Sequence, residues 1–176
     1  MSTGTLSQAA FDRIGDTLVR ALTGLSPEQL RRQPAGPDSN PIGWMTWHLS
    51  RGHDRNFSTL LGKEPAWVTD GWHERFRLPS DIGGGGGATI EEVRAFDPID
   101  AETLIGYWLA ARTRSRELLD AIQDSDLDRL TPAGASRVQN EAFKGTIARM
   151  MSDAFQHIGQ VCYVRGLVDR PGWYGS

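Results

Sequence analysis

Four long stretches of this chain repeat their apolar residues at the spacing of an α-helix, and this pattern limits the possible folds most. Residues 7–24, 41–61, 100–122 and 140–168 each place apolar side chains three or four positions apart, so one side of each helix would be apolar. No segment shows the period-two alternation of a half-buried strand, and no unit of 20–50 residues repeats. The sequence therefore predicts an all-α fold, a four-helix bundle in which the apolar sides face one another.

Residues 63–99 interrupt the helical pattern between the second and third long helices. They contain prolines and a run of five glycines, Gly83–Gly87, and a capping box of Thr89 and Glu92 predicts one short helix within them. A second capping pattern, at Ser26–Gln29, predicts another short helical turn. Connections this long in compact domains are commonly functional. We expect a long loop excursion across one end of the bundle, and a simple up-down-up-down order is not required.

Composition excludes several classes of protein. The 176 residues fit a single domain, 1–176, and 19 basic against 22 acidic residues leave a net charge of −3, so the basic footprint of a nucleic-acid-binding protein is missing. No apolar run has the length of a membrane helix, and residues 1–10 carry no positive charge or apolar core of a signal peptide. One cysteine, Cys162, excludes a disulfide framework. We expect a cytoplasmic protein with no membrane segment and no nucleic-acid partner.

The fourth helix carries the clearest chemical signal. On a helical projection His157 falls about 20° from Met150 and Val164 of the apolar stripe, and Asp153, four residues earlier, falls about 40° from His157 on the same side. An unpartnered buried carboxylate costs several kcal/mol, so something must compensate Asp153. Asp153 and His157 would either share a metal ion or be structural, as a core Asp–His or Asp–Arg pair, and the spacing alone slightly favours the structural pair.

The other histidines are weaker candidates. His48 lies on a mixed face of the second helix and is by itself more typical of a packed or partly exposed side chain. His53 sits in the charged run Arg51–Arg55 and His73 in the irregular excursion, so both are expected to face solvent. Cys162 is more typical of a small buried side chain than of a nucleophile. Two histidines and one carboxylate are nevertheless a common ligand set for zinc, nickel or iron.

Two helical motifs resemble the DinB/YfiT-like superfamily of metal-dependent four-helix-bundle proteins. The first runs from Asn40 through Trp44 and Trp47 to His48, and the second from Asp153 through His157 to Gly166. The segment 71–79 is similar to a loop of actinobacterial-type members. The resemblance covers nearly the whole chain and implies a metal ion held by three residues on two helices.

By position, the resemblance places the metal ligands at His48, Asp153 and His157. Most members carry histidine or glutamate where this chain has Asp153. Characterised relatives include thiol S-transferases and an isomerase that use mycothiol or bacillithiol. The resemblance therefore implies a divalent ion, zinc or nickel, a low-molecular-weight thiol as cosubstrate, and a metal-dependent transfer of that thiol to a small electrophile.

Further roles are expectations of the same hypothesis. Arg165 would bind an anionic group of the cosubstrate, and Trp72 and Arg75 would close over the pocket, with Trp67 and Phe76 anchoring the loop. The superfamily often pairs and the chain has six tryptophans, so we expect a homodimer. The alternative is a non-catalytic binding or scaffold protein in which the histidine and aspartate residues are structural or vestigial.

Overall fold

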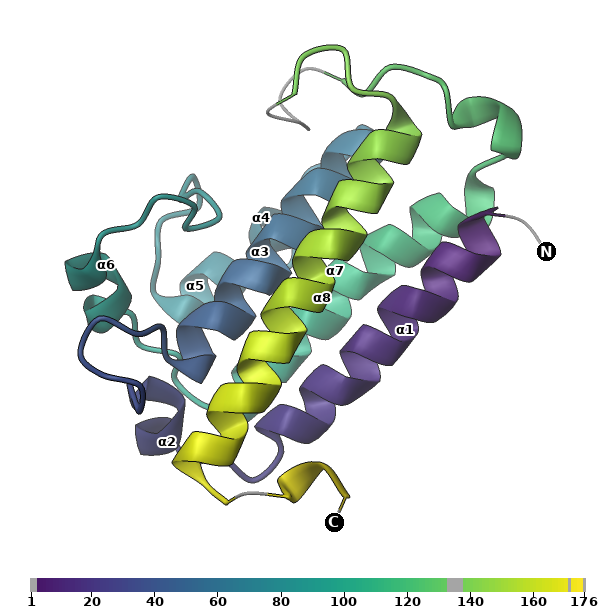
Figure 1. Cartoon of the computed structure of the whole chain (residues 1–176). Helices are drawn as coiled ribbons and strands as arrows, with labels where there is room; N and C mark the ends of the chain where they lie inside the picture. Colours follow the sequence, from purple (N-terminus) through teal and green to yellow (C-terminus); the bar gives the residue numbers. More distant parts are fainter. Residues whose placement is uncertain (1–2, 133–137, 171, 176) are drawn as a thin grey trace.

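The chain folds into a helical bundle, shown as a computed structural model in Figure 1. The structure describes residues 3–132, 138–170 and 172–175, and within them it contains no strand, only an isolated bridge between Leu130 and Ala142. Four long helices form the bundle: α1 (Thr3–Leu22), α3 (Ile42–Leu61), α7 (Ala101–Ala121) and α8 (Phe143–Val168). Shorter elements are α2 (Pro27–Arg31), α4 (Ala66–Thr69), α5 (Trp72–Phe76), α6 (Ile90–Ala95) and the 3₁₀ turns Asp124–Asp126 and Trp173–Gly175. The predicted all-α bundle is confirmed.

The order of helices around the bundle explains the long connection. Both α1 and α3 pack against α7 and against α8, so each long helix has two neighbours. In Figure 1, α1 and α8 run downward while α3 and α7 run upward. Because α3 and α7 are parallel neighbours, the chain must travel back along the bundle between them. The bundle therefore does not have the simple up-down-up-down order.

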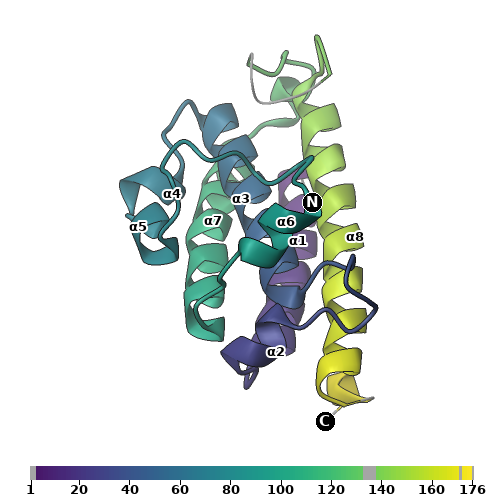
Figure 2. The same ribbon diagram turned by 90° about the vertical axis from the view of Figure 1, so that its left-hand side faces the viewer.

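This connection is more helical than the sequence predicts. Only α6 was expected, with the capping box of Thr89 and Glu92 that the structure shows, but α4 and α5 are present as well. The first backbone N–H groups of α4, at Ala66 and Trp67, donate to the buried carboxylate of Asp54 at 2.9 and 2.8 Å. Figure 2 shows α4 and α5 beside α7, with α6 lying across α3. A cap supplied from α3 is invisible to local sequence patterns.

The other predicted helix ends are close to those observed. The capping box at Ser26 begins α2, Asp100 caps α7 by accepting from Thr103 N at 2.7 Å, and Gly62 ends α3 in the left-handed region. Helix α1 begins at Thr3, earlier than predicted, because Gly4 and Ser7 are buried and extend its packed side beyond the large apolar residues.

Most of the tryptophans form the core. Trp47, Trp67 and Trp108 are at most 1% exposed, and Trp44 and Trp72 are buried as well. Trp72, which was expected to close over the pocket, packs inward instead, because α4 and α5 turn its ring and that of Trp67 toward α7 and Tyr107. The high tryptophan content also gives no support to a dimer, since the core accounts for it.

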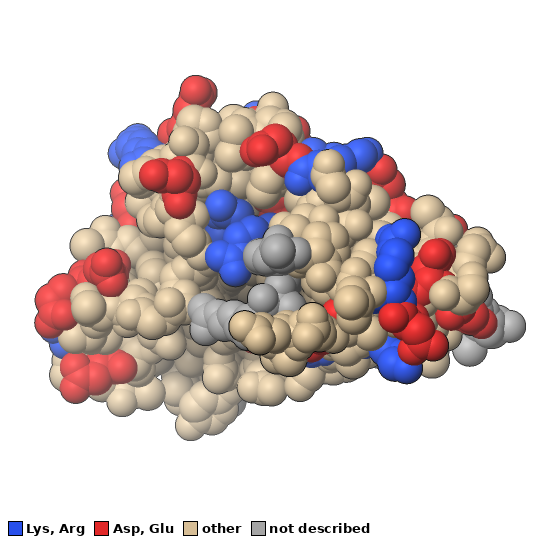
Figure 3. All heavy atoms as spheres, turned by 90° about the horizontal axis from the view of Figure 1, so that it is seen from above, with Lys and Arg blue, Asp and Glu red and all other residues tan. Residues whose placement is uncertain are grey.

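The distribution of charged side chains on the surface agrees with the nearly equal numbers of acidic and basic residues. On the face shown in Figure 3, acidic and basic side chains are interspersed. None of the described helices has both the length and the apolar character needed to span a membrane.

Candidate functional site

Two histidines from different helices meet at the surface between α3 and α8. The ring centroids of His48 and His157 are 4.8 Å apart, and the ring planes are inclined by 75°. Both side chains are half-buried, so they are ordered by packing yet still reachable from outside.

Asp153 lies one helical turn before His157 and points at it. Its Oδ1 is 3.5 Å from His157 Nε2. The hydrogen bond with His157 is the largest cause of a lowered pKa of Asp153, and the positive charge of either histidine adds to it. The same hydrogen bond raises the pKa of His157 above its ordinary value, against the opposing effect of burial. A negative carboxylate beside a positively charged neighbour is thus the favoured state of this pair.

Both imidazoles are oriented through their Nδ1 atoms. His48 Nδ1 contacts the carbonyl oxygen of Gly84, and His157 Nδ1 lies 3.0 Å from the amide oxygen of Gln160. Carbonyl oxygens only accept, so each Nδ1 carries the hydrogen and each neutral ring has its lone pair on Nε2. Histidines that bind metals typically donate their other N–H to such an oxygen, which fixes the ring for coordination.

These hydrogen bonds test whether the site suits a cation. With Nδ1–H donated to Gln160, a neutral His157 would point its Nε2 lone pair at the Asp153 carboxylate, which is also an acceptor. That arrangement is favourable only with a positive charge between them, either a proton on Nε2 or a metal ion. A proton on Nε2, which the raised pKa of His157 favours, satisfies the pair, and the nitrogen and oxygen atoms of these side chains are also of the type that binds divalent ions. The described residues nevertheless contain no three His, Cys, Asp or Glu side chains already gathered as metal ligands.

A cavity of about 260 Å³ opens beside the two histidines. Its lining comes from the start of α3, the glycine segment, α6 and α8: Asn40, Trp44, Met45, His48, Gly85, Gly86, Gly87, Ala88, Val93 and His157. The excursion between α3 and α7 is therefore in contact with the site through its glycines. Its aromatic residues Trp67, Trp72 and Phe76 lie elsewhere, buried against Tyr107.

The three residues expected to bind the cosubstrate lie away from this cavity, and none of them lines it. Arg165 is buried near the end of α8, where Nη2 lies 3.1 Å from Asp169 Oδ2 and 3.5 Å from Thr23 O. The guanidinium of Arg75 stacks 4.4 Å from the Trp72 ring centroid. The structure thus places His48 against His157 and Asp153 beside His157, and it places the three side chains expected to bind the cosubstrate elsewhere.

His53 corrects another expectation. It is completely buried, in ring contact with Phe11, Phe57 and Trp108, and neither ring nitrogen has a hydrogen-bond partner in the described part of the chain. Burial lowers its pKa to about 3, while the charge of Asp153 raises it slightly and that of Arg112 lowers it. The charged run around it misleads because Arg51 and Asp54 are buried too. His73 is half-buried.

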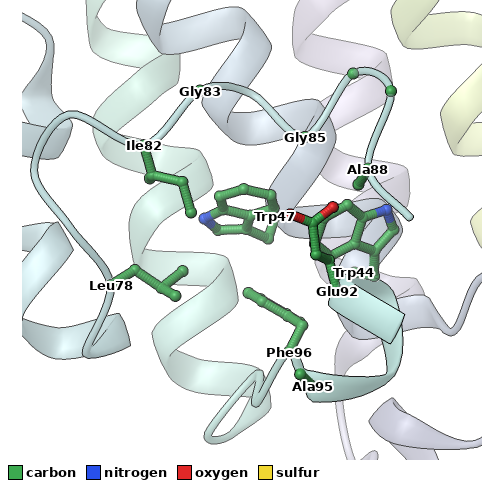
Figure 4. A pocket seen from close by; sticks show the side chains of 12 residues that line it. Trp44, Trp47, Leu78, Ile82, Gly83, Gly85, Ala88, Glu92, Ala95 and Phe96 are labelled. Carbon is green, nitrogen blue, oxygen red and sulfur yellow. The ribbon is translucent and has the colours of Figure 1, made fainter. Parts of the chain in front are cut away.

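A second cavity, of about 440 Å³, adjoins the first and was not predicted. It lies between α3, α6 and the excursion, with Trp44, Trp47 and Phe96 in its wall (Figure 4). Trp44 and the segment 85–88 line both cavities. One sequence feature could have indicated this second cavity. The chain has a run of glycines, and it has two tryptophans three residues apart on one helix against which that run could pack.

Comparison with known proteins decides the family. A sequence profile of the DinB superfamily matches residues 10–161. The chain belongs to the DinB superfamily. A solved structure described as a conserved protein from Enterococcus faecalis superimposes with a TM-score of 0.84 and 25% sequence identity, covering 96% of this chain and 98% of that one. A search of curated proteins finds no match to the chain. These findings confirm the predicted resemblance and the helical-bundle fold of this DinB protein.

Proposed function

We propose that this DinB-superfamily protein is a metal-dependent enzyme that transfers a low-molecular-weight thiol to a small electrophile. The supporting observation is that His48 and His157 lie 4.8 Å apart between ring centroids and line one cavity, with Asp153 3.5 Å from His157. The ligand atoms for a divalent ion, zinc or nickel, would be His48 Nε2, His157 Nε2 and an Asp153 carboxylate oxygen. A bound divalent ion lowers the pKa of a coordinated thiol and so supplies the thiolate nucleophile at neutral pH.

The thiol must come from a cosubstrate. Cys162 is the single cysteine of the chain, it does not line the histidine cavity, and burial raises its pKa. In the proposed reaction the cosubstrate sulfur forms a bond to an electrophilic carbon, the leaving group departs with its electron pair, and the thiol proton passes to solvent. Such thiols stay reduced in the cytoplasm, which is the compartment we propose.

The protein's own contribution is orientation. Gly84 and Gln160 hold the two rings by their Nδ1 atoms, and the backbone of α3 and α8 fixes their separation. Asp153 favours a positive charge at His157. Preorganised groups of this kind avoid the entropy cost of assembling the site around each substrate.

Metal content is the deciding measurement. The purified protein should contain zinc or nickel at one ion per chain, and His48→Ala, His157→Ala and Asp153→Asn should each lose most of it while staying folded. His73→Ala is the matched control, since His73 lies outside the site, and it should retain the metal. The loaded protein should then conjugate mycothiol to an electrophile, and a chelator should stop the reaction.

A protein that retains no metal and conjugates no thiol would contradict the proposal. The non-catalytic bundle would then be the better explanation, and His48 and His157 would be an internal polar contact.

We also propose a homodimer. Phe155 and Tyr163 expose 51% and 68% of their surface on α8, and Leu167 exposes 42%. A second copy would cover these side chains, and exposed apolar residues grouped on one helix are typical of interaction surfaces.

A further inference from the structure

The larger cavity has the form of a ligand site with its own chemistry. Its volume of about 440 Å³ falls within the range of small-molecule pockets. It is lined by Trp44, Trp47, Leu78, Ile82, Gly83, Gly85, Gly86, Gly87, Ala88, Glu92, Ala95 and Phe96. Figure 4 shows the two indoles and Phe96 around a common space, with Leu78 and Ile82 on its other side.

Glycine keeps this space open. A Cβ on Gly85 would lie 2.8 Å from Trp44 Cζ2 and 2.9 Å from Trp47 Cζ3, and Gly85 has a φ of +80° that other residues rarely adopt. The loop backbone therefore rests directly on the two indoles. Gly83 and Gly87 face open space with no atom within 4 Å of a built Cβ. The segment 85–88 lines both cavities without filling either of them.

The charge of the lining selects against anions. Glu92 is the one charged side chain among the described residues that line the cavity, and no lysine or arginine lines it. Its carboxylate is already held by Thr89 N at 2.7 Å in the cap of α6. Indole faces are also electron-rich and repel negative charge. A neutral ligand meets no such penalty.

The cavity wall also contains a donor that none of the described residues satisfies. Trp47 is 1% exposed, and its Nε1–H has no acceptor among the described residues. In Figure 4 this nitrogen points toward the side of the cavity where Ile82 and Leu78 lie. A buried donor without a partner costs about 1–3 kcal/mol. An acceptor atom on a bound ligand would remove that cost once Ile82 moves aside.

We propose that this aromatic cavity binds a neutral, planar aromatic molecule, and that this molecule is the electrophilic substrate. The binding itself follows from the cavity, and only the role as electrophile rests on the proposed function. The histidine cavity holds the polar groups His48, His157 and Asn40, which suit a thiol, whereas the aromatic cavity suits its apolar partner. The two cavities share Trp44 and the segment 85–88 in their linings, so molecules bound in them would lie side by side.

A matched pair of fluorescent probes tests the binding. N-Phenyl-1-naphthylamine is neutral, and 8-anilino-1-naphthalenesulfonate is the same scaffold with an anionic group. Protein treated with a chelator should bind the neutral probe with enhanced, blue-shifted emission and the anionic probe at least about tenfold more weakly. Equal binding of the two probes, or none of the neutral one, would overturn the inference.

A cavity-filling variant tests whether the probe binds in the aromatic cavity. Ala95 is an exposed residue of α6 that lines the cavity, so Ala95→Phe should fill the space and weaken binding of the neutral probe at least about tenfold without unfolding the protein. Ala9→Phe, on the exposed face of α1, is the matched control and should bind as the unaltered protein does. Unchanged binding by Ala95→Phe, with a thermal transition like that of the control, would refute the assignment.

The same variants separate this inference from the proposed enzyme activity. His157→Ala should lose metal yet still bind the neutral probe, and Ala95→Phe should keep its metal. With the metal-loaded enzyme, Ala95→Phe should lower kcat/KM for 1-chloro-2,4-dinitrobenzene, which is neutral and aromatic. The kcat/KM for iodoacetamide, which is neutral and small, should stay unchanged. Equal losses for both electrophiles would contradict the substrate role, whereas a lack of any activity would count only against the proposed function.

Discussion

The imidazole rings of His48 and His157 lie 4.8 Å apart between their centroids, across the contact between α3 and α8, and an oxygen atom holds each ring at its Nδ1. For His48 that oxygen belongs to Gly84 in the excursion, and for His157 it belongs to Gln160 on the same helix. The position of the rings thus depends on the bundle, while their orientation depends on neighbours outside the expected ligand set.

The Gln160 contact leads to a prediction about metal affinity. Gln160→Leu removes the acceptor for His157 Nδ1–H, so the ring can rotate and lose its fixed tautomer. Loss of such an orienting partner typically weakens metal binding about 10- to 100-fold. Isothermal titration of metal-free protein with Zn²⁺ measures this change.

Gln156 supplies the control for this variant. It is exposed on the same helix and bonds Ser152, so Gln156→Leu should leave the affinity for Zn²⁺ unchanged. Equal affinities in all three proteins would show that the Gln160 contact does not orient the ring.

His53 predicts a loss of stability in acid. Its pKa is about 3 in the folded protein and about 6.5 when exposed, so the unfolded chain takes up the proton first. The stability is complete above pH 6.5, where His53 is neutral in both states. As the pH falls below 6.5, the free energy of unfolding should drop by up to about 1.4 kcal/mol per pH unit.

Denaturant unfolding between pH 4 and pH 7 checks this slope. His53→Leu replaces the ring by an apolar side chain and should flatten the curve in that interval. The charges of Asp153 and Arg112 remain in both proteins, so they do not produce the difference. A curve with the same slope in the variant would assign the acid sensitivity to other groups.

The sequence predicts the bundle because its long helices carry their own signals. The apolar stripe of α1, from Phe11 through Leu18 to Leu22, is buried as the spacing indicates. The Asp153–His157 pair also follows from spacing, since both lie on one side of one helix. The contact of His48 with His157 depends on tertiary packing, and only the family resemblance predicted it.

Other features cannot be predicted locally because distant segments create them. His53 is buried despite its charged neighbours, since α3 has packing partners on nearly every side. The four-residue helix α4 begins at the carboxylate of Asp54, which belongs to another element. Arg165 forms an ion pair with Asp169 near the C-terminal end of α8. The position of a residue around a helix does not tell which side chain it contacts.

Asp54 is predicted to stabilise the excursion strongly. It is completely buried, and besides Ala66 and Trp67 it accepts from the hydroxyl of Tyr107 at 3.1 Å. Asp54→Ala leaves these donors without an acceptor, at about 1–3 kcal/mol each, so the free energy of unfolding should fall by about 3 kcal/mol or more. Asp70→Ala, at an exposed position after α4, should change it little. Similar small losses in both variants would contradict this role.

The proposed dimer is tested by its mass in solution. Light scattering should give twice the 19.4 kDa of one chain at micromolar concentration. Tyr163→Lys places a charge where the second copy would pack and should yield the monomer. Leu109→Lys changes an apolar residue that is 46% exposed on α7 and should leave the dimer intact. A monomeric unaltered protein would refute the proposal.

The last prediction separates the two roles of the glycine segment, its backbone conformation and its contact with the indoles. Gly85 and Gly87 have nearly the same φ, +80° and +85°, but only Gly85 has atoms within 3 Å of a built Cβ. Gly87→Ala should therefore cost only the conformational strain, about 1 kcal/mol. Gly85→Ala adds overpacking against Trp44 and Trp47, for a total loss of about 2–4 kcal/mol unless the loop lifts.

If the glycine segment lifts from the indoles, ligand binding should change. Lifting would pull the Gly84 carbonyl away from His48 and widen the aromatic cavity, so Gly85→Ala should weaken Zn²⁺ binding and alter binding of the neutral probe, while Gly87→Ala changes neither. Deleting Gly86 shortens the wall without touching the core, and it should likewise change ligand binding more than the thermal midpoint. Equal effects of Gly85→Ala and Gly87→Ala on stability and on both ligands would show that the contact with the indoles carries no function, because backbone strain would then account for everything observed.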